Sequence, residues 1–552
     1  MTTGQWIRSG APWIWLNSAA VGACILLVGG LILLIAARGV GHFWPARVFE
    51  FLVINESGEQ VRINGQIRET ERVPSDQSDD DLGNSGARRT RTRLLLKTAN
   101  RDLTGQDFRW VLQDQILQQT APLSLVVLER AEWGAFFGYA VGIKDDGVVL
   151  DSADVWGDFE RKLELVSQLR IERDKLQKQE IGQINYQLEQ LRLHERALQL
   201  AGSDDPEDLH RIERDRSALE QQYRLMEERL TNLNEAMGQY SLIAKSDLGD
   251  ESYLELPLQS ILGGWRPNDM GLMQRITHFF RQLWAFVSQD PREANTEGGI
   301  FPAIFGTILM VLLMTVFVTP LGVIAGIYLR EYARQGLLTR TIRIAVNNLA
   351  GVPSIVYGVF GLGFFVYALG GSIDRLFFQA ALPSPTFGTG GLLWASLTLA
   401  LLTLPTVIVS TEEGLARIPK AMRESSLALG ATQWETLWRT VVPMASPGIM
   451  TGVILAVARA AGEVAPLMLV GVVKLAPTLP LDGNFPFLHL ERKFMHLGFH
   501  IYDVGFQSPN VEAARPLVYA TALLLVAVIL LLNIIAIHVR NNLRDKYQGL
   551  EA

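Results

Sequence analysis

Two ionisable residues, Arg459 and Glu463, stand four positions apart in the otherwise apolar stretch AVARAAGEVAP. An ionised group at the centre of a membrane helix costs about 2.5–3.5 kcal/mol, so such a group should face protein or water. Residues four apart share one face of a helix and can pair. Because a guanidinium fork suits an oxyanion, Arg459 is predicted to line a translocation path, with Glu463 neutralising it while the path is empty. The alternative is a structural ion pair between helices of two subunits.

A second candidate site is the stretch EEGLARIPKAMRESSLALGATQWETLWRTVVP, which lies between two apolar runs. Glu424 is followed by the small residues Ser425 and Ser426, then by Gly430, and an amphipathic segment ends at Pro443. Small side chains let the surface of another protein approach closely, and glycine lets the chain turn sharply. The stretch therefore predicts a helix-turn-helix that another protein grips, with an ordinary amphipathic loop as the alternative.

Six apolar runs must position these residues. A helix that crosses about 30 Å of hydrocarbon needs about 20 apolar residues, and six runs qualify: Trp13–Ala37, Ala303–Leu329, Ile344–Leu369, Leu392–Thr411, Gly448–Val473 and Leu517–Val539. The first is too long for the core of a signal peptide, and no A-x-A-like site follows it before Arg38. The sequence predicts a mainly α fold with six membrane-spanning helices, the first one uncleaved.

The Lys and Arg residues of the short loops predict the orientation. They gather at Arg330, Arg334, Arg340 and Arg343, at Arg417, Lys420, Arg423 and Arg439, and at Arg540, Arg544 and Lys546. If the spans alternate, these three places lie on one side, which the positive-inside rule makes the cytoplasm. Both termini are then cytoplasmic, and residues 39–302 are predicted to be periplasmic.

The long segment after the first span has its own organisation. Residues 39–157 contain short runs typical of strands, such as FLVI, QVRINGQI and RLLLK, and predict a β-rich domain. Residues 158–240 change to heptads, with Arg216 and Glu195 as the exceptions in two core positions, and predict an antiparallel coiled-coil hairpin. Residues 241–297 predict return strands and an amphipathic helix over 270–287, which lies either at the membrane–water boundary or on the β domain.

The remaining domain boundaries follow from the apolar runs. Residues 1–38 form the predicted first transmembrane helix, and residues 298–552 form a transmembrane core that carries the cytoplasmic loop 412–445. In the last outer loop, LHLERKFMHLGFHIYD places His489, His496 and His500 along one helical stripe. That stripe favours a gate helix over a metal site.

Several function classes are excluded by composition. Fifty Lys and Arg against 57 Asp and Glu give a net charge of −7, which provides no global basic field for nucleic acid. The single cysteine, Cys24, excludes an intramolecular disulfide. No GxxxxGK[ST] occurs, so the chain lacks a phosphate-cradling nucleotide loop. We expect a transport subunit without cofactor or metal rather than an enzyme, with ATP hydrolysis on a partner chain.

The stretch that contains Glu424 and Pro443 resembles a motif of a known family. ABC import permeases share a cytoplasmic motif of Glu-Ala-Ala, three residues, Gly, nine residues and Ile-x-Leu-Pro. Glu424-Ser425-Ser426, Gly430 and Thr440-x-Val442-Pro443 match this spacing, with Ser, Thr and Val as small or conservative replacements. In that family the segment is the coupling helix that sits in a cleft of the ATPase.

Further segments resemble the PstA permeases of phosphate-specific ABC importers, a branch of the binding-protein-dependent transport family. They are GGIFPAIFGTILM, IYLREYA, NNLAGVPSIVYGVFGLG and PGIMTGVILAVARAAGEVAPLMLVG. The resemblance implies a permease subunit in the bacterial inner membrane, with a PstC-like second permease, two cytosolic ATPase subunits and a periplasmic phosphate-binding protein as partners. It does not cover residues 39–297, an insert foreign to typical permeases. Another oxyanion as cargo, or a membrane sensor or scaffold built on the hairpin, are the alternatives.

Overall fold

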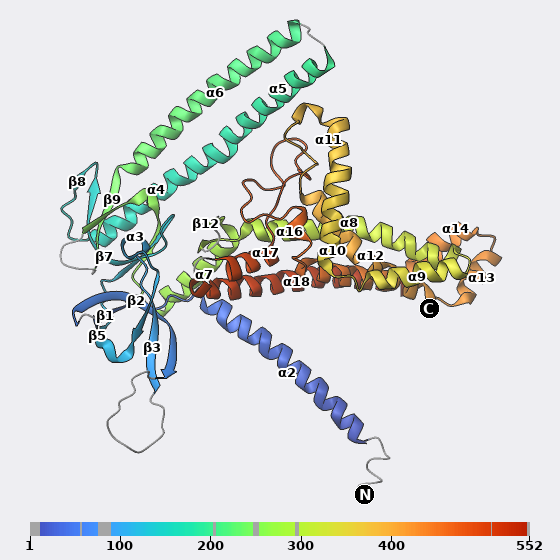
Figure 1. Cartoon of the computed structure of the whole chain (residues 1–552), viewed down its shortest axis with the longest axis horizontal. Helices are drawn as coiled ribbons and strands as arrows, with labels where there is room; N and C mark the ends of the chain where they lie inside the picture. Colours follow the sequence, from blue (N-terminus) through green and yellow to red (C-terminus); the bar gives the residue numbers. More distant parts are fainter. Residues whose placement is uncertain are drawn as a thin grey trace, which may run out of the picture. The chain divides into compact units, whose positions relative to one another are not determined.

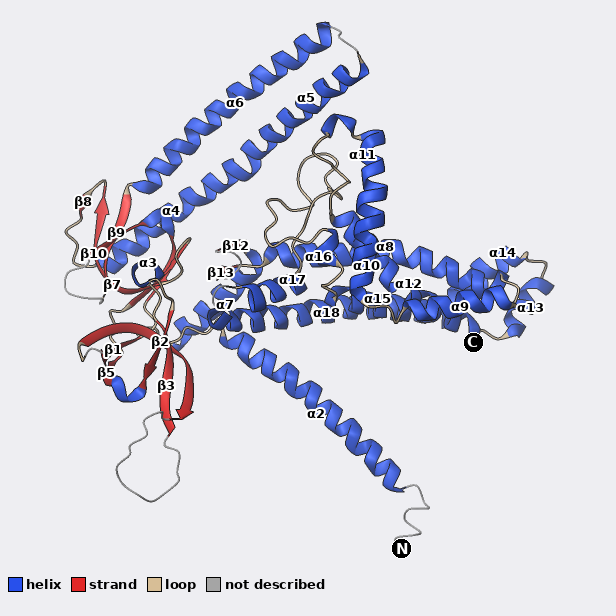
Figure 2. Ribbon diagram, viewed as in Figure 1, coloured by secondary structure: helices blue, strands red, loops and turns tan. Residues whose placement is uncertain are grey.

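The computed structural model describes residues 11–55, 58–74, 90–202, 206–246, 253–292, 297–508 and 511–548. The chain divides into two compact units. The helical unit contains residues 1–42, 287–291 and 300–552, and the β-rich unit contains residues 43–286 and 292–299. In Figure 2 the strands of the two large sheets lie in the β-rich unit, which also carries two long neighbouring helices, α5 (Gly182–Ala201) and α6 (Pro206–Gly238).

The helical unit is built almost entirely of helices. Its helices are α2 (Ala11–Gly41), α8 (Phe301–Ile327), α9 (Leu337–Leu349), α10 (Ser354–Phe360), α11 (Gly371–Phe377), α12 (Leu392–Ala416), α13 (Lys420–Ala428), α14 (Gln433–Thr436), α15 (Val442–Gly462), α16 (Leu467–Val470), α17 (Leu497–Tyr502) and α18 (Val511–Gln548). Four π-helical stretches continue some of them: Tyr328–Tyr332, Gly361–Gly370, Leu437–Val441 and Asp503–Gln507.

Six helical stretches in the described part of the chain are long and apolar enough to cross a membrane: Trp13–Gly41, Phe301–Tyr332, Ser354–Phe377, Leu392–Ala416, Gln433–Gly462 and Ala514–Asn542. The predicted number of spans is confirmed. Two predicted boundaries are wrong. Ile344 belongs to the separate helix α9, because Gly351 and Pro353 interrupt the chain before the third span. The fifth span does not continue to Val473 but ends at Gly462, four residues before Pro466.

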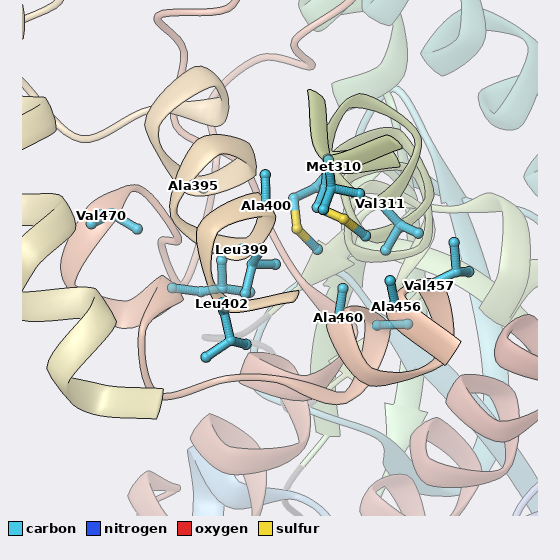
Figure 3. Packing of buried hydrophobic residues seen from close by; sticks show 14 of the residues in the cluster. Met310, Val311, Ala395, Leu399, Ala400, Leu402, Ala456, Val457, Ala460 and Val470 are labelled. Carbon is cyan, nitrogen blue, oxygen red and sulfur yellow. The ribbon is translucent and has the colours of Figure 1, made fainter. Parts of the chain in front are cut away.

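Helix α12 is the centre of the helical unit and packs against α8 and α15. Glycines permit the close approach. A Cβ on Gly322 would lie 2.6 Å from the Val407 side chain, and one on Gly448 would lie 2.8 Å from Cα of Gly414. Figure 3 shows the buried cluster that results, with Met310 of α8, Leu399 of α12 and Ala456 of α15 among its members. Small residues at helix interfaces are the usual basis of packing in membranes.

The β-rich unit contains two larger antiparallel sheets. The first has the order β4-β3-β2-β1-β5, and the second has the order β10-β9-β7-β6-β11 with β8 paired to β7. The strands are β1 (Phe49–Ile54), β2 (Gln60–Pro74), β3 (Thr90–Lys97), β4 (Phe108–Leu112), β5 (Ile116–Thr120), β6 (Val126–Arg130), β7 (Phe136–Asp145), β8 (Val148–Val149), β9 (Tyr240–Lys245), β10 (Tyr253–Pro257) and β11 (Ile261–Trp265). The short helix α3 (Arg101–Thr104) separates β3 from β4, and β12 (Pro291–Arg292) pairs with β13 (Glu297–Gly298).

Two long helical arms leave the second sheet and lie side by side (Figure 1). The first arm is α4 (Val155–Lys175), a π-helical stretch (Leu176–Ile181) and α5 (Gly182–Ala201), and the second is α6 (Pro206–Gly238). Gly202 ends the first arm with φ 66°, as its sequence position predicts. Arg216 and Glu195, the two charged residues in predicted core positions, form an ion pair with each other across the arms.

The base of the two helical arms is fixed to the second sheet. Phe159 and Val166 of α4 and Met237 of α6 are buried in one cluster with side chains of β6, β7 and β9. Arg170 donates hydrogen bonds to the carbonyls of Gln259 and Ile261, at 3.2 and 2.8 Å. The bases of the two helical arms therefore share one buried core with the second sheet.

Helix α7 (Leu272–Ser288) confirms the predicted amphipathic helix. Its buried side chains, His278 and Phe286, contact the rings of Trp265 and Phe43 within the β-rich unit. A second set of large apolar side chains on α7 is exposed: Leu272, Met273, Phe280 and Trp284. Packing on the β-rich unit thus accounts for one face of the helix and leaves the other available for lipid.

We expect Phe159→Ala to loosen the base of the two helical arms. Removing a fully buried phenylalanine costs about 3–5 kcal/mol, and Phe159 is completely buried. Hydrogen exchange of the α4 amides should report this loss as faster local opening. Ile171→Ala, an exposed position on the same helix, should leave the exchange rates nearly unchanged. Equal rates in both variants would contradict the packing described here.

Candidate functional site

The predicted coupling residues lie on a short helical hairpin between α12 and α15. Glu424, Ser425 and Ser426 are on α13, and Glu424 and Ser425 are exposed. Gly430 follows with φ 89° and open space around its Cβ position. This backbone conformation disfavours any residue with a side chain. The structure therefore confirms a sharp turn at Gly430, while the role of these residues stays a prediction.

Hydrogen bonds give this turn a defined shape. Thr432 caps α14 and forms a capping box with Glu435, in which the backbone N–H of Glu435 donates to Oγ1 of Thr432 at 3.2 Å. The hydroxyls of Ser426 and Thr436 lie 2.9 Å apart and join α13 to α14. A predicted coupling residue, Ser426, is thus also part of the internal structure of the segment.

The same segment exposes several large apolar side chains. Leu429 beside Gly430 is 89% exposed. Leu427 and the tryptophans Trp434 and Trp438 are exposed as well, and the two indole rings lie 5.3 Å apart. Clustered aromatic and aliphatic side chains on a surface are typical of a protein interface. The arrangement suits a surface that a partner protein covers.

An ion pair holds α13 to the helical unit. Nη2 of Arg423 donates to Glu331 at 2.9 Å and to the carbonyl of Leu415 at 2.9 Å. Nη1 of Arg423 also donates to the carbonyl of Ile418, at 3.3 Å. One guanidinium thus connects α13 both to the end of α12 and to the π-helical end of α8.

A second ion pair lies near the same end of the bundle. Arg343 of α9 donates to the carboxylate of Glu412 on α12, at 3.2 Å. From the sequence, Arg343 and Arg423 were interpreted only as charges that set the orientation, and neither ion pair was predicted. Their acidic partners, Glu331 and Glu412, lie in the segments IYLREYA and EEGLARIP. A carboxylate beside a membrane span could have indicated each ion pair.

Beyond the turn the chain rises into α15 without a break. The π-helical stretch Leu437–Val441 continues into α15, and Pro443 lies near the start of α15. Because the helix is continuous there, the missing N–H of Pro443 removes one backbone hydrogen bond of the helix. Leu437, Val441 and Ala445 are buried against Leu415 and Ile418. The continuous helical stretch Gln433–Gly462 has 30 residues, or about 45 Å, which exceeds about 30 Å of hydrocarbon. Its first turns can therefore project beyond the membrane.

Arg459 and Glu463 lie at the opposite end of α15. Nε of Arg459 is 3.4 Å from Oε1 of Glu463, and the two side chains are 35% and 21% exposed. The predicted pair therefore forms, although Glu463 stands one residue beyond the helix with extended backbone angles. The break after Gly462 was missed because the apolar run continues through it. Both side chains remain partly open to their surroundings.

The predicted histidine stripe is wrong. Helix α17 begins only at Leu497, and His489 lies in the preceding loop, where its ring contacts Asp482 at 2.9 Å and Glu491 at 3.2 Å. His496 and His500 are buried, and burial lowers the pKa of His496 to about 3 and that of His500 to about 4. Both rings are therefore neutral near pH 7. Among the described residues, no group of three or more potential ligands could hold a metal ion.

Residues 318–545 match the family described as binding-protein-dependent transport system inner membrane component. The phosphate transport system permease protein PstA of Mycobacterium leprae is 38% identical over 208 residues, which are 38% of this chain and 62% of that protein. PstA of Pasteurella multocida is 32% identical over 210 residues, 37% of this chain and 68% of that protein. PstA 1 of Mycobacterium tuberculosis is 39% identical, over 32% of this chain and 52% of its own length.

The chain thus spans about half to two thirds of the length of these curated relatives. Among solved structures, a chain of the inward-facing MetNI methionine ABC transporter is 18% identical, with a TM-score of 0.32 over 48% of this chain and 98% of that one.

We expect Arg423→Met to free α13 from the helical unit. The substitution keeps the apolar stem but removes the hydrogen bonds to Glu331 and Leu415, each worth about 1.5–3 kcal/mol when a charge is involved. The amides of residues 422–428 should then exchange faster, by about tenfold or more. Arg417→Met, at an exposed arginine six residues earlier, should change little. An unchanged α13 in Arg423→Met would show that the ion pair does not hold it.

Proposed function

Because this chain belongs to the family of binding-protein-dependent transport system inner membrane components, we propose that it is a permease subunit of an ATP-driven importer whose cargo is inorganic phosphate. It would supply the path, and a separate polypeptide would hydrolyse ATP. The observation that carries this proposal is the segment 424–443, a compact helical turn that presents exposed apolar side chains around Gly430.

In this proposal the segment 424–443 fits a cleft of the ATPase. Closure of the ATPases on ATP would push α13 and α14, and the movement would pass into α15 through the buried contacts of Leu437 and Val441 with Leu415. Pro443 and Arg459 are sixteen residues apart on α15, or about 24 Å along the helix axis. One rigid helix therefore links the driven end to the charged end, which supports alternating access by rocking of α15.

The proposed assembly follows the family. This chain would pair with a PstC-like second permease subunit in the bacterial inner membrane, with two ATPase subunits on the cytoplasmic side and a phosphate-binding protein on the periplasmic side. Both termini would be cytoplasmic and residues 39–302 periplasmic. The exposed apolar side chains along α2, including Leu26, Leu27 and Leu33, would contact lipid or the second permease.

Phosphate as cargo comes from the names of the relatives, and the charged pair agrees with it. The guanidinium of Arg459 is partly exposed and its contact with Glu463 is long for a charge-assisted hydrogen bond. An incoming oxyanion could therefore replace the carboxylate at low cost. Another tetrahedral oxyanion would satisfy the same geometry and is the nearest alternative cargo.

A sensor or scaffold is the second candidate function, and the helical arms favour it, because transport does not require them. We propose that the arms pair as an antiparallel coiled coil, a feature supported by the cross-arm ion pair of Arg216 with Glu195. Co-purification decides between the two candidates. A transporter subunit should retain an ATPase through the segment 424–443, whereas a sensor should retain none.

We expect Gly430→Val to abolish coupling. A β-branched residue at φ 89° is a conformational outlier, so the turn must rearrange and the exposed face around Leu429 is lost. Phosphate uptake by proteoliposomes that contain the assembled complex should fall at least tenfold, together with the amount of ATPase that co-purifies. Gly336→Val is the matched control, since Gly336 has extended angles that any residue adopts. Normal uptake in Gly430→Val would contradict the proposal that the segment 424–443 transmits the movement of the ATPase.

We also expect Arg459→Ala to suppress phosphate uptake by at least about tenfold, because the oxyanion loses its charged partner in the path. Arg459→Lys should retain part of the activity, since it keeps the charge and loses the fork. Arg375→Ala, which removes an arginine of α11 away from the charged pair, serves as the control. If Arg459→Ala transports phosphate with unchanged rate and affinity, the pair is only structural.

A further inference from the structure

The β-rich unit contains a partly open cavity of about 160 Å³ that the transport function does not use. It lies where the first sheet meets the loop around α3 and the end of β9. All the residues that line it except Ile63 have polar side chains: Arg62, Asn64, Thr98, Asn100, Thr104, Gln106, Arg109 and Ser246. Two guanidiniums, three side-chain amides and three hydroxyls thus line one small space.

Asn64 provides the strongest evidence for a ligand. Its side chain is buried, with 6% exposure, and neither its Nδ2 nor its Oδ1 has a hydrogen-bond partner among the described residues. Leaving a buried polar group unpaired costs about 1–3 kcal/mol. A buried amide that offers both a donor and an acceptor to a cavity calls for an occupant with one acceptor and one donor.

The other buried amide in the wall, Asn100, shows what a structural asparagine looks like. Its Nδ2 donates to the carbonyl of Phe137 at 2.9 Å and to Oγ of Ser246 at 3.2 Å. Its Oδ1 accepts from the backbone N–H of Phe137 at 2.9 Å. The side-chain amide of Asn100 therefore has hydrogen-bond partners within the fold for both its nitrogen and its oxygen, whereas the amide of Asn64 has none among the described residues.

The backbone beside the cavity is held in an uncommon conformation. Ala99 and Asn100 both have positive φ, 53° and 55°, and Ala99 is completely buried. Non-glycine residues in the left-handed region cost about 1–3 kcal/mol and cluster at ligand sites. The hydrogen bonds of Asn100 fix this turn, so the wall of the cavity is preorganised.

Charge defines the class of ligand. Nη1 of Arg62 lies 3.7 Å from Glu50, too far for a hydrogen bond, and Nη2 of Arg109 lies 3.4 Å from Oδ1 of Asn55. Strong guanidinium hydrogen bonds to oxyanions measure about 2.7–2.9 Å. Glu50 offsets part of the charge of Arg62, so the cavity favours an anion of low charge.

Size limits the ligand further. A water molecule takes about 30 Å³ of liquid volume, and a cavity of about 150 Å³ in another protein holds benzene. The cavity thus has room for an anion of a few non-hydrogen atoms. We propose that it binds a small oxyanion that also carries a hydroxyl group, of which dihydrogen phosphate is the simplest, with Asn64 bonding both functions and Arg109 and Arg62 holding the charge.

Equilibrium binding of radiolabelled inorganic phosphate to the purified full-length chain tests this proposal. The binding should be saturable, and sulfate, which has no hydroxyl at neutral pH, should compete at least about tenfold less well. Asn64→Leu and Arg109→Ala should each weaken phosphate binding by about tenfold or more. Arg109 is exposed, so its substitution leaves the core intact even if Asn64→Leu disturbs it.

Two controls complete the experiment. Arg72→Ala removes an exposed arginine on the same strand, β2, outside the cavity, and should bind phosphate as the wild type does. Arg459→Ala should also retain this binding, which separates the cavity from the proposed translocation path. Phosphate affinity that is unchanged in Asn64→Leu and Arg109→Ala, equal affinity for sulfate, or competition by glycerol would overturn the proposal.

Discussion

The close approach of α12 to α8 and α15 is the constraint on which the helical unit depends. Helices that lie in lipid gain little from the hydrophobic effect and associate through tight van der Waals contact. Gly322 against Val407 and Gly414 against Gly448 allow that contact. The bundle fixes both ends of α15, so that the segment 424–443 and the pair Arg459–Glu463 occupy opposite ends of one helix. Helix packing maintains the separation between the segment 424–443 and the charged pair, because the loops alone could not maintain it.

Much of this arrangement could be predicted from the sequence. Apolar run length predicted six spans, and heptads predicted two long helical arms, because both signals repeat over many residues. The helix breaks were predicted less well. The end of α15 at Gly462 lies inside a continuous apolar run, so hydropathy alone does not mark it. Strands β4, β5 and β11 were missed because segments such as ILQQT lack clear alternation.

Side-chain pairs across elements were beyond the reach of sequence patterns. Arg423 with Glu331, and Arg343 with Glu412, join residues that are 92 and 69 positions apart, and no local spacing marks them as partners. The hairpin gives the opposite case. Arg216 and Glu195 were visible as irregularities in a regular pattern, and the structure pairs one irregularity with the other. An exception in a periodic sequence therefore carried more structural information than isolated charges did.

Arg423 and Arg459 of the helical unit show how the same side chain can be held in two ways. Arg423 bonds Glu331 and a carbonyl at 2.9 Å each, so displacing it would leave two partly buried acceptors without this partner. Arg459 lies 3.4 Å from a carboxylate that stands just beyond the helix end. Replacing that contact by an oxyanion would give shorter bonds and cost little. In the proposed transport cycle, Arg423 would transmit force without yielding, and Arg459 would exchange its partner at each passage.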